Sequence, residues 1–270
     1  MIRLAVRAPA EAAELVLAAL LELAPSGVEQ VDGDGVVELA VYGVPGELPE
    51  LDPGEAQVGG VRVSVSSAEV PDDWEERWKL FNVPVLIGER LYVRPPWEKA
   101  AAGPGMIDLP IDPGQAFGTG AHATTRLSLE LLLQLARGGT RGSLCDLGCG
   151  SGVLAIAAAR LGFAPVSAID FDPLAVQATT ANADHNGVCL ERVERLDLRV
   201  AASPAADVVA ANLMRPLLLG VAEMMRDLPR WLIVSGLLED EADEVAAAFA
   251  PLSERRRLAD RGWSALLLER

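Results

Sequence analysis

The chain has 270 residues, half of them hydrophobic, and a formal net charge of −16 with a sequence pI near 4.5. This length accommodates one large domain or two modest ones, and the apolar content suffices for a core. The acidic balance argues against a nucleic-acid or anionic-membrane surface, above all in residues 1–70, where three basic and twelve acidic residues give a net charge of −9. It is compatible with a basic protein partner.

The three cysteines, Cys145, Cys149 and Cys189, form no disulfide framework and indicate a reducing cytosol. They and the two histidines are too scattered for a zinc site, so no metal is expected. The apolar start of the chain is interrupted by Glu11 and Glu14, which predicts a strand and a helix rather than a membrane span.

Residues 1–70 predict a small α+β domain. The expected elements are a strand over 1–8, a helix over 9–24, two hairpin strands within 28–43 and a strand over 61–70. Residues 44–60 are rich in turn formers and are expected to be a loop. The order is typical of a ferredoxin-like split βαβ unit whose second helix is shortened or missing.

Residues 71–105 are expected to connect this domain to the rest of the chain. A helix is predicted over 71–81, in which Trp74 and Trp78 share one side and would pack against a domain. Residues 83–97 are rich in strand formers.

From residue 106 the pattern changes to alternating strand-like and helical runs. A strand and a glycine-rich loop over 106–125 precede a helix over 126–136, and the alternation then continues. Such alternation is typical of a parallel, doubly wound sheet covered by helices on both faces. The last residues predict two strands with a turn at Arg261–Gly262, an antiparallel pair that closes one edge. Residues 106–270 therefore predict the larger α/β domain.

The stretch "DLGCGSG", residues 146–152, follows a strand and precedes a helix. Glycines in this place let the backbone turn sharply and approach a ligand closely. We therefore expect a nucleotide-like ligand across the carboxyl end of the strand, with Asp170 at the end of the next strand accepting hydrogen bonds from two ribose hydroxyls. A tight turn without a ligand is the simpler alternative.

Dinucleotide binding is a second alternative, since its fingerprint is G-x-G-x-x-G. Here Gly148 and Gly150 are followed by Gly152, and Val153 stands where the last glycine should be. The spacing departs from the fingerprint where a pyrophosphate has to sit on the helix N-terminus, which favours a nucleoside ligand without a pyrophosphate.

Two further pieces point to the same edge of the sheet. The glycine-rich loop 112–125 could lie over the ligand and present Phe117, Thr119 and the hydroxyls of Thr124 and Thr125. Asn212 ends the fourth strand of the sheet, where its amide and the neighbouring carbonyls can accept hydrogen bonds from an amine. Each piece alone would fit an ordinary loop or turn.

Together, "DPGQAFGTGAHATT", "DLGCGSGVLAIAAARLG", "AIDFDP" and "DVVAANL" resemble the class I S-adenosylmethionine-dependent methyltransferases. More narrowly, they resemble the bacterial family that methylates large-subunit ribosomal protein L-eleven (L11), whose linker is similar to "DDWEERWKLFNVPVLIGERLYV". The resemblance covers residues 72–270, and the first 70 residues match in layout.

This resemblance implies a class I methyltransferase Rossmann-like doubly wound sheet with a small N-terminal ferredoxin-like domain. It implies S-adenosylmethionine as the cofactor, and an N-terminal domain that holds L11 as the protein substrate. We expect a cytoplasmic monomer without direct contact to nucleic acid or membrane.

The resemblance also implies roles for single residues. Four residues are expected to contact the cofactor and four to line its site: Thr125, Gly148, Asp170 and Asn212, then Phe117, Gly118, Thr119 and Gly150. One position departs from the family, which commonly has proline where this chain has Ala123. The change removes a fixed φ angle and is expected to loosen the loop.

The expected reaction is in-line attack of a neutral amine on the methyl carbon of the sulfonium, with Asn212 as the catalytic residue that orients the amine. Asn212 cannot take the proton that a lysine of pKa about 10.4 must lose. His122 could act as a base, although a role in shaping the 117–125 loop is favoured. Three alternatives stay open: an amine methyltransferase for another protein or a small molecule, an NAD-dependent oxidoreductase, and a non-catalytic protein that keeps the cofactor fold.

Overall fold

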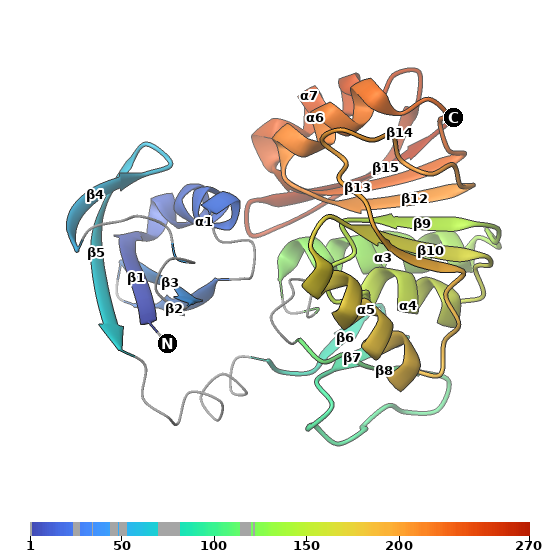
Figure 1. Cartoon of the computed structure of the whole chain (residues 1–270), viewed down its shortest axis with the longest axis horizontal. Coiled ribbons are helices and arrows are strands. Elements are labelled where there is room, and N and C mark those ends of the chain that lie inside the picture. Colours follow the sequence, from blue (N-terminus) through green and yellow to red (C-terminus); the bar gives the residue numbers. More distant parts are fainter. Residues whose placement is uncertain are drawn as a thin grey trace. The chain divides into compact units, whose positions relative to one another are not determined.

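The chain folds into two compact units, Met1–Phe81 and Asn82–Arg270 (Figure 1). The computed structural model describes residues 2–23, 28–33, 35–43, 48, 53–69, 82–113, 120 and 122–270. The predicted helix with Trp74 and Trp78 and the predicted contacts Phe117, Gly118 and Thr119 lie outside the described residues. The predicted division into 1–70, 71–105 and 106–270 stays a prediction; residues 82–105 belong to the second compact unit.

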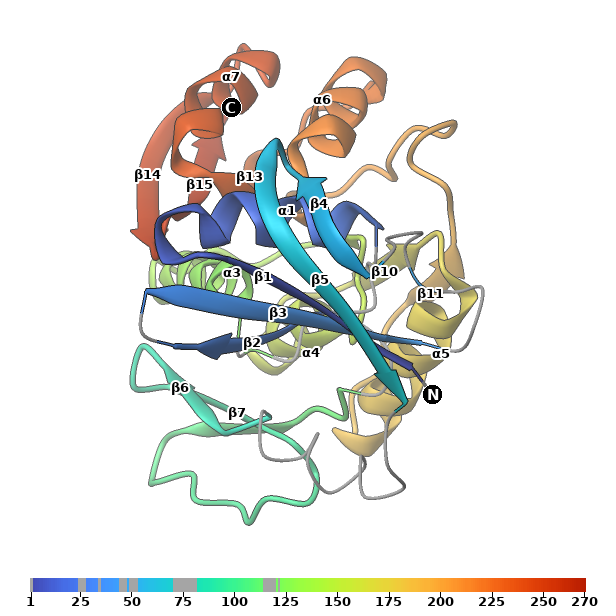
Figure 2. The ribbon, with the colours of Figure 1, turned by 90° about the vertical axis from the view of Figure 1, so that its left-hand side faces the viewer.

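The first unit is an antiparallel sheet with one described helix packed on it (Figure 2). Its elements are β1 (Ile2–Pro9), α1 (Ala13–Leu23), β2 (Glu29–Asp32), β3 (Val36–Gly43), β4 (Gly54–Val58) and β5 (Val61–Glu69). The strand order is β2-β3-β1-β5-β4, so β3 lies between the two strands that α1 connects. Val16 and Leu20 of α1 are fully buried, which holds the helix to the sheet.

The strand β4 corrects the sequence interpretation, which placed Gly54–Val58 in a loop. The stretch "GEAQV" has few strand-forming residues, so local preference does not indicate a strand. It is a strand because Gly59 and Gly60, with φ angles of 59° and 77°, form a tight turn that pairs it with β5. Pairing across this turn outweighs the weak local propensity.

The second unit is built on a seven-stranded sheet of order β11-β10-β9-β12-β13-β15-β14. Its strands are β9 (Leu144–Leu147), β10 (Val166–Asp170), β11 (Arg192–Arg195), β12 (Val208–Asn212), β13 (Trp231–Leu238), β14 (Ser253–Asp260) and β15 (Trp263–Glu269). The helices are α3 (Ala123–Arg137), α4 (Val153–Arg160), α5 (Pro173–His185), α6 (Arg215–Met224) and α7 (Ala242–Ala248). Helices α3, α4 and α5 cover one face and α6 and α7 the other, as the alternation predicts (Figure 1).

The C-terminal hairpin is confirmed. Strands β14 and β15 are antiparallel, with Asp260 paired to Trp263 across the turn Arg261–Gly262, and they close one edge of the sheet. Strand β14 is largely exposed, whereas β15 is almost wholly buried. None of the helices that the structure describes combines the length and apolar character that crossing a bilayer requires.

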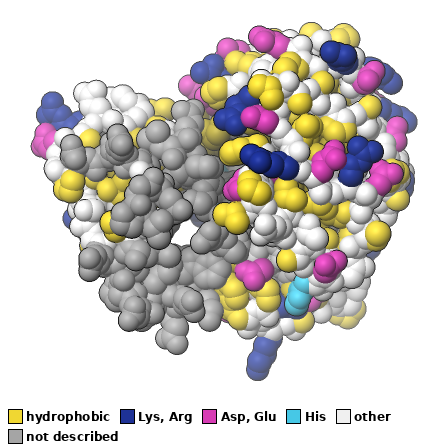
Figure 3. Space-filling view, viewed as in Figure 1, with side chains coloured by type: hydrophobic (Ala, Val, Ile, Leu, Met, Phe, Trp, Pro, Cys, Tyr) yellow, Lys and Arg dark blue, Asp and Glu magenta, His cyan; other side chains and the backbone are white. Residues whose placement is uncertain are grey.

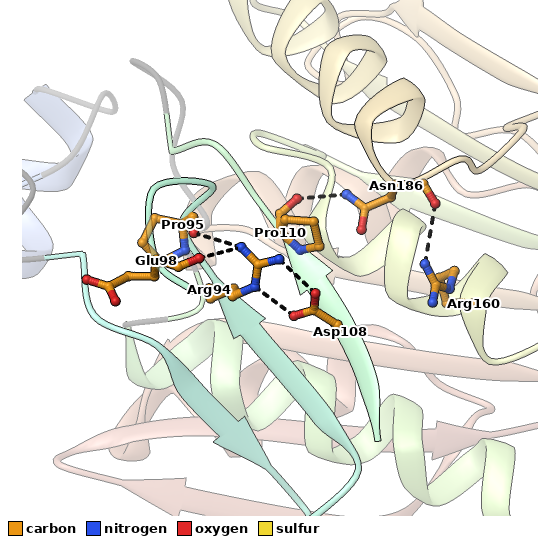
Figure 4. A network of polar contacts seen from close by, with 7 residues as sticks. All are labelled: Arg94, Pro95, Glu98, Asp108, Pro110, Arg160 and Asn186. Atoms are coloured by element: carbon orange, nitrogen blue, oxygen red, sulfur yellow. Dashed lines mark hydrogen bonds and ion pairs between the residues drawn. The ribbon is translucent and has the colours of Figure 1, made fainter. Parts of the chain in front are cut away.

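A three-stranded sheet precedes α3 and contains β6 (Val85–Ile87), β7 (Leu91–Arg94) and β8 (Ile107–Pro110). Arg94 binds both carboxylate oxygens of Asp108 at 2.8 Å and donates to the carbonyl of Glu98 at 2.7 Å (Figure 4). The carboxylate raises the pKa of the Arg94 guanidinium. The pair joins β7 to β8 and fixes where the chain enters the segment before α3.

Candidate cofactor-binding site

Three of the predicted site residues lie side by side at the carboxyl edge of the main sheet. Leu147 of β9 is paired with Ile169 of β10 and with Ala211 of β12. The next residue on each strand is therefore Gly148, Asp170 or Asn212, at one level. Since neighbouring strands lie about 4.8 Å apart, the Asp170 and Asn212 backbones flank Gly148 within roughly 10 Å of each other.

The glycine turn between β9 and α4 adopts a conformation that side chains disfavour. Gly148, Gly150 and Gly152 have φ angles of 71°, 54° and 81°. A Cβ atom on Gly148 would lie 2.3 Å from Cδ2 of Leu213, so the missing side chain lets two loops approach closely. The turn leads into α4, whose N-terminal amides face the carboxyl edge of the sheet.

Asp170 organises the loops on its side of the edge. Its Oδ2 accepts a hydrogen bond from the Gly150 amide and its Oδ1 one from the Asp172 amide, both at 3.0 Å. Burial raises the pKa of the carboxyl group, which is 8% exposed. Each carboxylate oxygen keeps a further lone pair, so Asp170 can also accept hydrogen bonds from two hydroxyls of a ligand.

Asn212 and Thr125 meet on the other side of the glycine turn. The Asn212 amide nitrogen donates to Oγ1 of the buried Thr125 over a long 3.4 Å. Thr125 lies in the first turn of α3, and the buried Ser235 hydroxyl binds the carbonyl of the preceding Thr124 at 3.2 Å. The start of α3 is thereby fixed to the centre of the sheet.

His122 caps α3, which supports a structural role. Its Nδ1 accepts the Thr124 amide at 3.4 Å and lies 2.8 Å from the Thr124 hydroxyl oxygen. The ring edge packs on Trp263, with centroids 5.1 Å apart. Burial, assisted by the charge of Arg126, lowers the pKa of His122 to about 4. The imidazole is neutral at pH 7 and a poor acceptor for the proton of a lysine ammonium.

Hydrogen bonds and strand register thus bring the described candidates together: Gly150 with Asp170, Asn212 with Thr125, and Gly148 between the two pairs. Their contacts with a ligand stay predictions. Three neighbouring residues have structural roles or positions. Asp172 caps α5, His185 is exposed at its end, and Cys149 is a buried residue of the turn.

Residues 48–270 match the model of the family described as ribosomal protein L11 methyltransferase. The chain belongs to this family. It is 40% identical over 257 residues to the ribosomal protein L11 methyltransferase of Pelotomaculum thermopropionicum, covering 89% of this chain and 79% of the relative. To the protein of that name from Pectobacterium atrosepticum it is 42% identical over 196 residues, covering 68% of this chain and 64% of the relative.

A solved structure agrees with the family. The ribosomal protein L11 methylase of Lactobacillus delbrueckii subsp. bulgaricus superimposes with a TM-score of 0.63 at 26% sequence identity, covering 70% of this chain and 98% of that one. The fold of this member of the L11 methyltransferase family is accordingly that of the class I methyltransferases, as the motifs predict.

Three residues that support the site were not predicted from the sequence. Thr179 and Asn182 of α5 donate hydrogen bonds to carbonyls of the glycine turn. Gly236 lets β13 approach Leu213 closely, because a Cβ on Gly236 would lie 2.4 Å from the Leu213 carbonyl oxygen. For Gly236 a signal exists: a glycine inside the apolar strand "WLIVSGLL" indicates close backbone approach.

Asp146, the first residue of the glycine motif, was also missed. It lies in the wholly buried strand β9 and is 1% exposed. Its Oδ2 accepts the Ala155 amide at 3.1 Å, while Oδ1 has no hydrogen-bond partner among the described residues. Burial raises the pKa of Asp146 to about 7. A charged residue inside an apolar strand is the signal that could have identified it.

The buried Asp146 carboxyl should make stability fall as pH rises. Between about pH 4 and pH 7 the unfolded chain has lost this proton and the folded chain keeps it, so raising the pH favours unfolding. We compare the free energy of unfolding of Asp146→Asn with that of wild type at each pH. This difference should favour the variant by about 2–4 kcal/mol more at pH 8 than at pH 5. Urea unfolding of both proteins at the two pH values measures this, and an equal difference at both would contradict it.

Proposed function

We propose that this protein transfers methyl groups from S-adenosylmethionine to lysine side-chain and N-terminal amines of ribosomal protein L11. The observation that carries the proposal is the meeting of two residue pairs, Gly150 with Asp170 and Asn212 with Thr125, at one sheet edge in a member of this family. The same membership favours methyl transfer over the NAD-dependent oxidoreductase that the glycine spacing left open.

The residues present fit the proposed cofactor. Gly148 lies at the carboxyl edge between Asp170 and Asn212, where a backbone without a side chain can approach a nucleoside closely. Asp170 would hold the ribose hydroxyls, and Gly148, Gly150, Thr125 and Asn212 would flank the rest of the molecule. When bound, S-adenosylmethionine supplies the activated methyl group.

The chain's own contribution is to position the amine and exclude water. Asn212 would accept a hydrogen bond from the incoming amine with its side-chain oxygen, because its amide nitrogen already faces Thr125. The amine must arrive without its extra proton, and a partly apolar site lowers a lysine pKa. His122 would hold the helix start and take no part in the proton transfer.

We assign recognition of L11 to residues 1–70, connected by 71–105 to the methyltransferase domain 106–270. The net charge of −9 in the first segment suits a basic protein substrate. On the face seen in Figure 3, acidic and basic side chains of the second unit are interspersed and do not form the basic patch that nucleic-acid binding requires. We place the enzyme in the cytoplasm as a monomer.

The test is mass spectrometry of purified L11 before and after incubation with enzyme and S-adenosylmethionine. We expect L11 to gain methyl groups on lysine and N-terminal amines. Asn212→Ala should slow the reaction about 100-fold, because the amine is no longer oriented. His185→Ala, a change at the exposed end of α5, is the control and should keep the wild-type rate. Unmodified L11 in the wild-type reaction would refute the proposed substrate.

A further inference from the structure

Asn182, in the last turn of α5, joins two segments that are far apart in the sequence. Its amide nitrogen donates to the carbonyl of Ser151 at 2.9 Å and to the carbonyl of Asp112 at 3.0 Å. Its amide oxygen accepts the backbone N–H of Asp112 at 2.8 Å. One side chain therefore bonds the glycine turn after β9 and the segment that follows β8.

These bonds are made inside the protein, where they cannot be replaced by water. Asn182 is 3% exposed, and both of its amide hydrogens as well as its oxygen are used. A buried backbone group that loses its partner costs more than an exposed one, because water does not compensate. The geometry specifies an amide here, since the position requires two donors and one acceptor.

Asn182 acts together with Thr179, which lies one helical turn earlier on the same face of α5. The Thr179 hydroxyl donates to the Gly150 carbonyl at 3.0 Å, so two successive carbonyls of the turn are held from α5. A peptide unit is planar, and fixing its oxygen also fixes the N–H on its other side. The directions of the Ser151 and Gly152 amides are therefore set by the helix face.

We propose that Asn182 is a positioning residue of the cofactor site, which holds the glycine turn in its binding conformation. The proposal rests on the function proposed above. Glycine residues give the turn little conformational preference of its own, so the turn depends on such outside support. Asn182 does not touch the cofactor; it acts through the peptide units of residues 150–152.

Asn186, the C-cap of the same helix, offers a matched control. Its amide nitrogen donates to the carbonyl of Pro110 at 2.7 Å (Figure 4). The same nitrogen donates to the carbonyl of Asn182 at 2.8 Å, and Asn186 is 8% exposed. Like Asn182, it is a buried amide whose nitrogen donates to two backbone carbonyls, but these belong to the last residue of β8 and to α5, and not to the glycine turn. Replacing either residue with Asp converts a double donor into an acceptor that faces two carbonyls.

The experiment compares wild type, Asn182→Asp and Asn186→Asp. Calorimetric titration with S-adenosylhomocysteine measures affinity, thermal unfolding measures stability, and amide hydrogen exchange of residues 150–152 in the ligand-free protein measures the turn. We expect both variants to lose similar stability. Asn182→Asp should weaken binding about tenfold or more and speed exchange in the turn, while Asn186→Asp should change neither by more than about threefold.

The outcomes separate this inference from the proposed function. If wild type does not bind S-adenosylhomocysteine, the proposed function fails, and the exchange data still judge the role of Asn182 in the turn. If wild type binds and both variants bind equally well, or both speed exchange equally, the inference is wrong. Should Asn182→Asp fail to fold, Asn182→Ala removes the same donors without adding charge, and the same comparison applies with Asn186→Ala.

Discussion

Replacing Asp170 with Ala is expected to weaken binding of S-adenosylhomocysteine strongly, by roughly 100-fold or more. The carboxylate holds the Gly150 and Asp172 amides at 3.0 Å each, and in the proposed complex it also accepts the ribose hydroxyls. Hydrogen bonds to a charged acceptor contribute roughly 1.5–3 kcal/mol each. Losing two of them weakens binding by roughly 10²–10⁴-fold, and the loss of the Gly150 anchor adds to this because the turn is no longer fixed.

Asp172→Ala is the control for this prediction. Asp172 lies two residues further along the same loop, and its side chain caps α5 by accepting the Leu174 amide at 2.8 Å. We expect this variant to lose about 1 kcal/mol of stability and to keep its affinity for the ligand. Calorimetric titration and thermal unfolding of both variants measure the contrast. Undiminished binding by Asp170→Ala would remove Asp170 from the cofactor site.

Much of the second unit could be predicted because its sequence pattern and its tertiary structure agree. Buried parallel strands such as β12 are apolar up to their last residue, and the connecting helices have caps such as Asp172 that can be read locally. The carboxyl-edge rule then places Asp170, Gly148 and Asn212 together, because parallel strands end on the same side. These predictions needed only the order of elements.

The remaining features depend on partners that no local pattern reveals. Strand β4 forms because it pairs with β5, although "GEAQV" has weak strand propensity. Asn182 lies within a helical run, where a polar residue is ordinarily solvent-exposed, and its partners Ser151 and Asp112 are 31 and 70 residues away. Asp146 does carry a sequence signal, a charged residue inside an apolar strand, but its raised pKa comes from burial, which only the folded structure shows.

Gly148→Ala is expected to reduce both stability and cofactor binding strongly. With φ at 71°, any residue with a Cβ costs about 1–2 kcal/mol here. The new methyl group would also meet Leu213 at 2.3 Å, and moving Leu213 disturbs its neighbour Asn212. Displacement of Asn212 and of the turn backbone affects both sides of the proposed site at once. We expect an affinity loss of about 100-fold, in addition to the backbone strain.

Gly187→Ala separates strain from the effect on the site. Gly187 has a similar φ of 62°, but a Cβ there would meet nothing within 4 Å. This control should lose about 1–2 kcal/mol of stability from the backbone alone and bind S-adenosylhomocysteine like wild type. Calorimetric titration and thermal unfolding of the pair decide the question. A cofactor that lies against this backbone would bind less tightly once Leu213 is displaced. If both variants bind equally well, the close approach at Gly148 therefore serves only the turn, and the cofactor lies elsewhere.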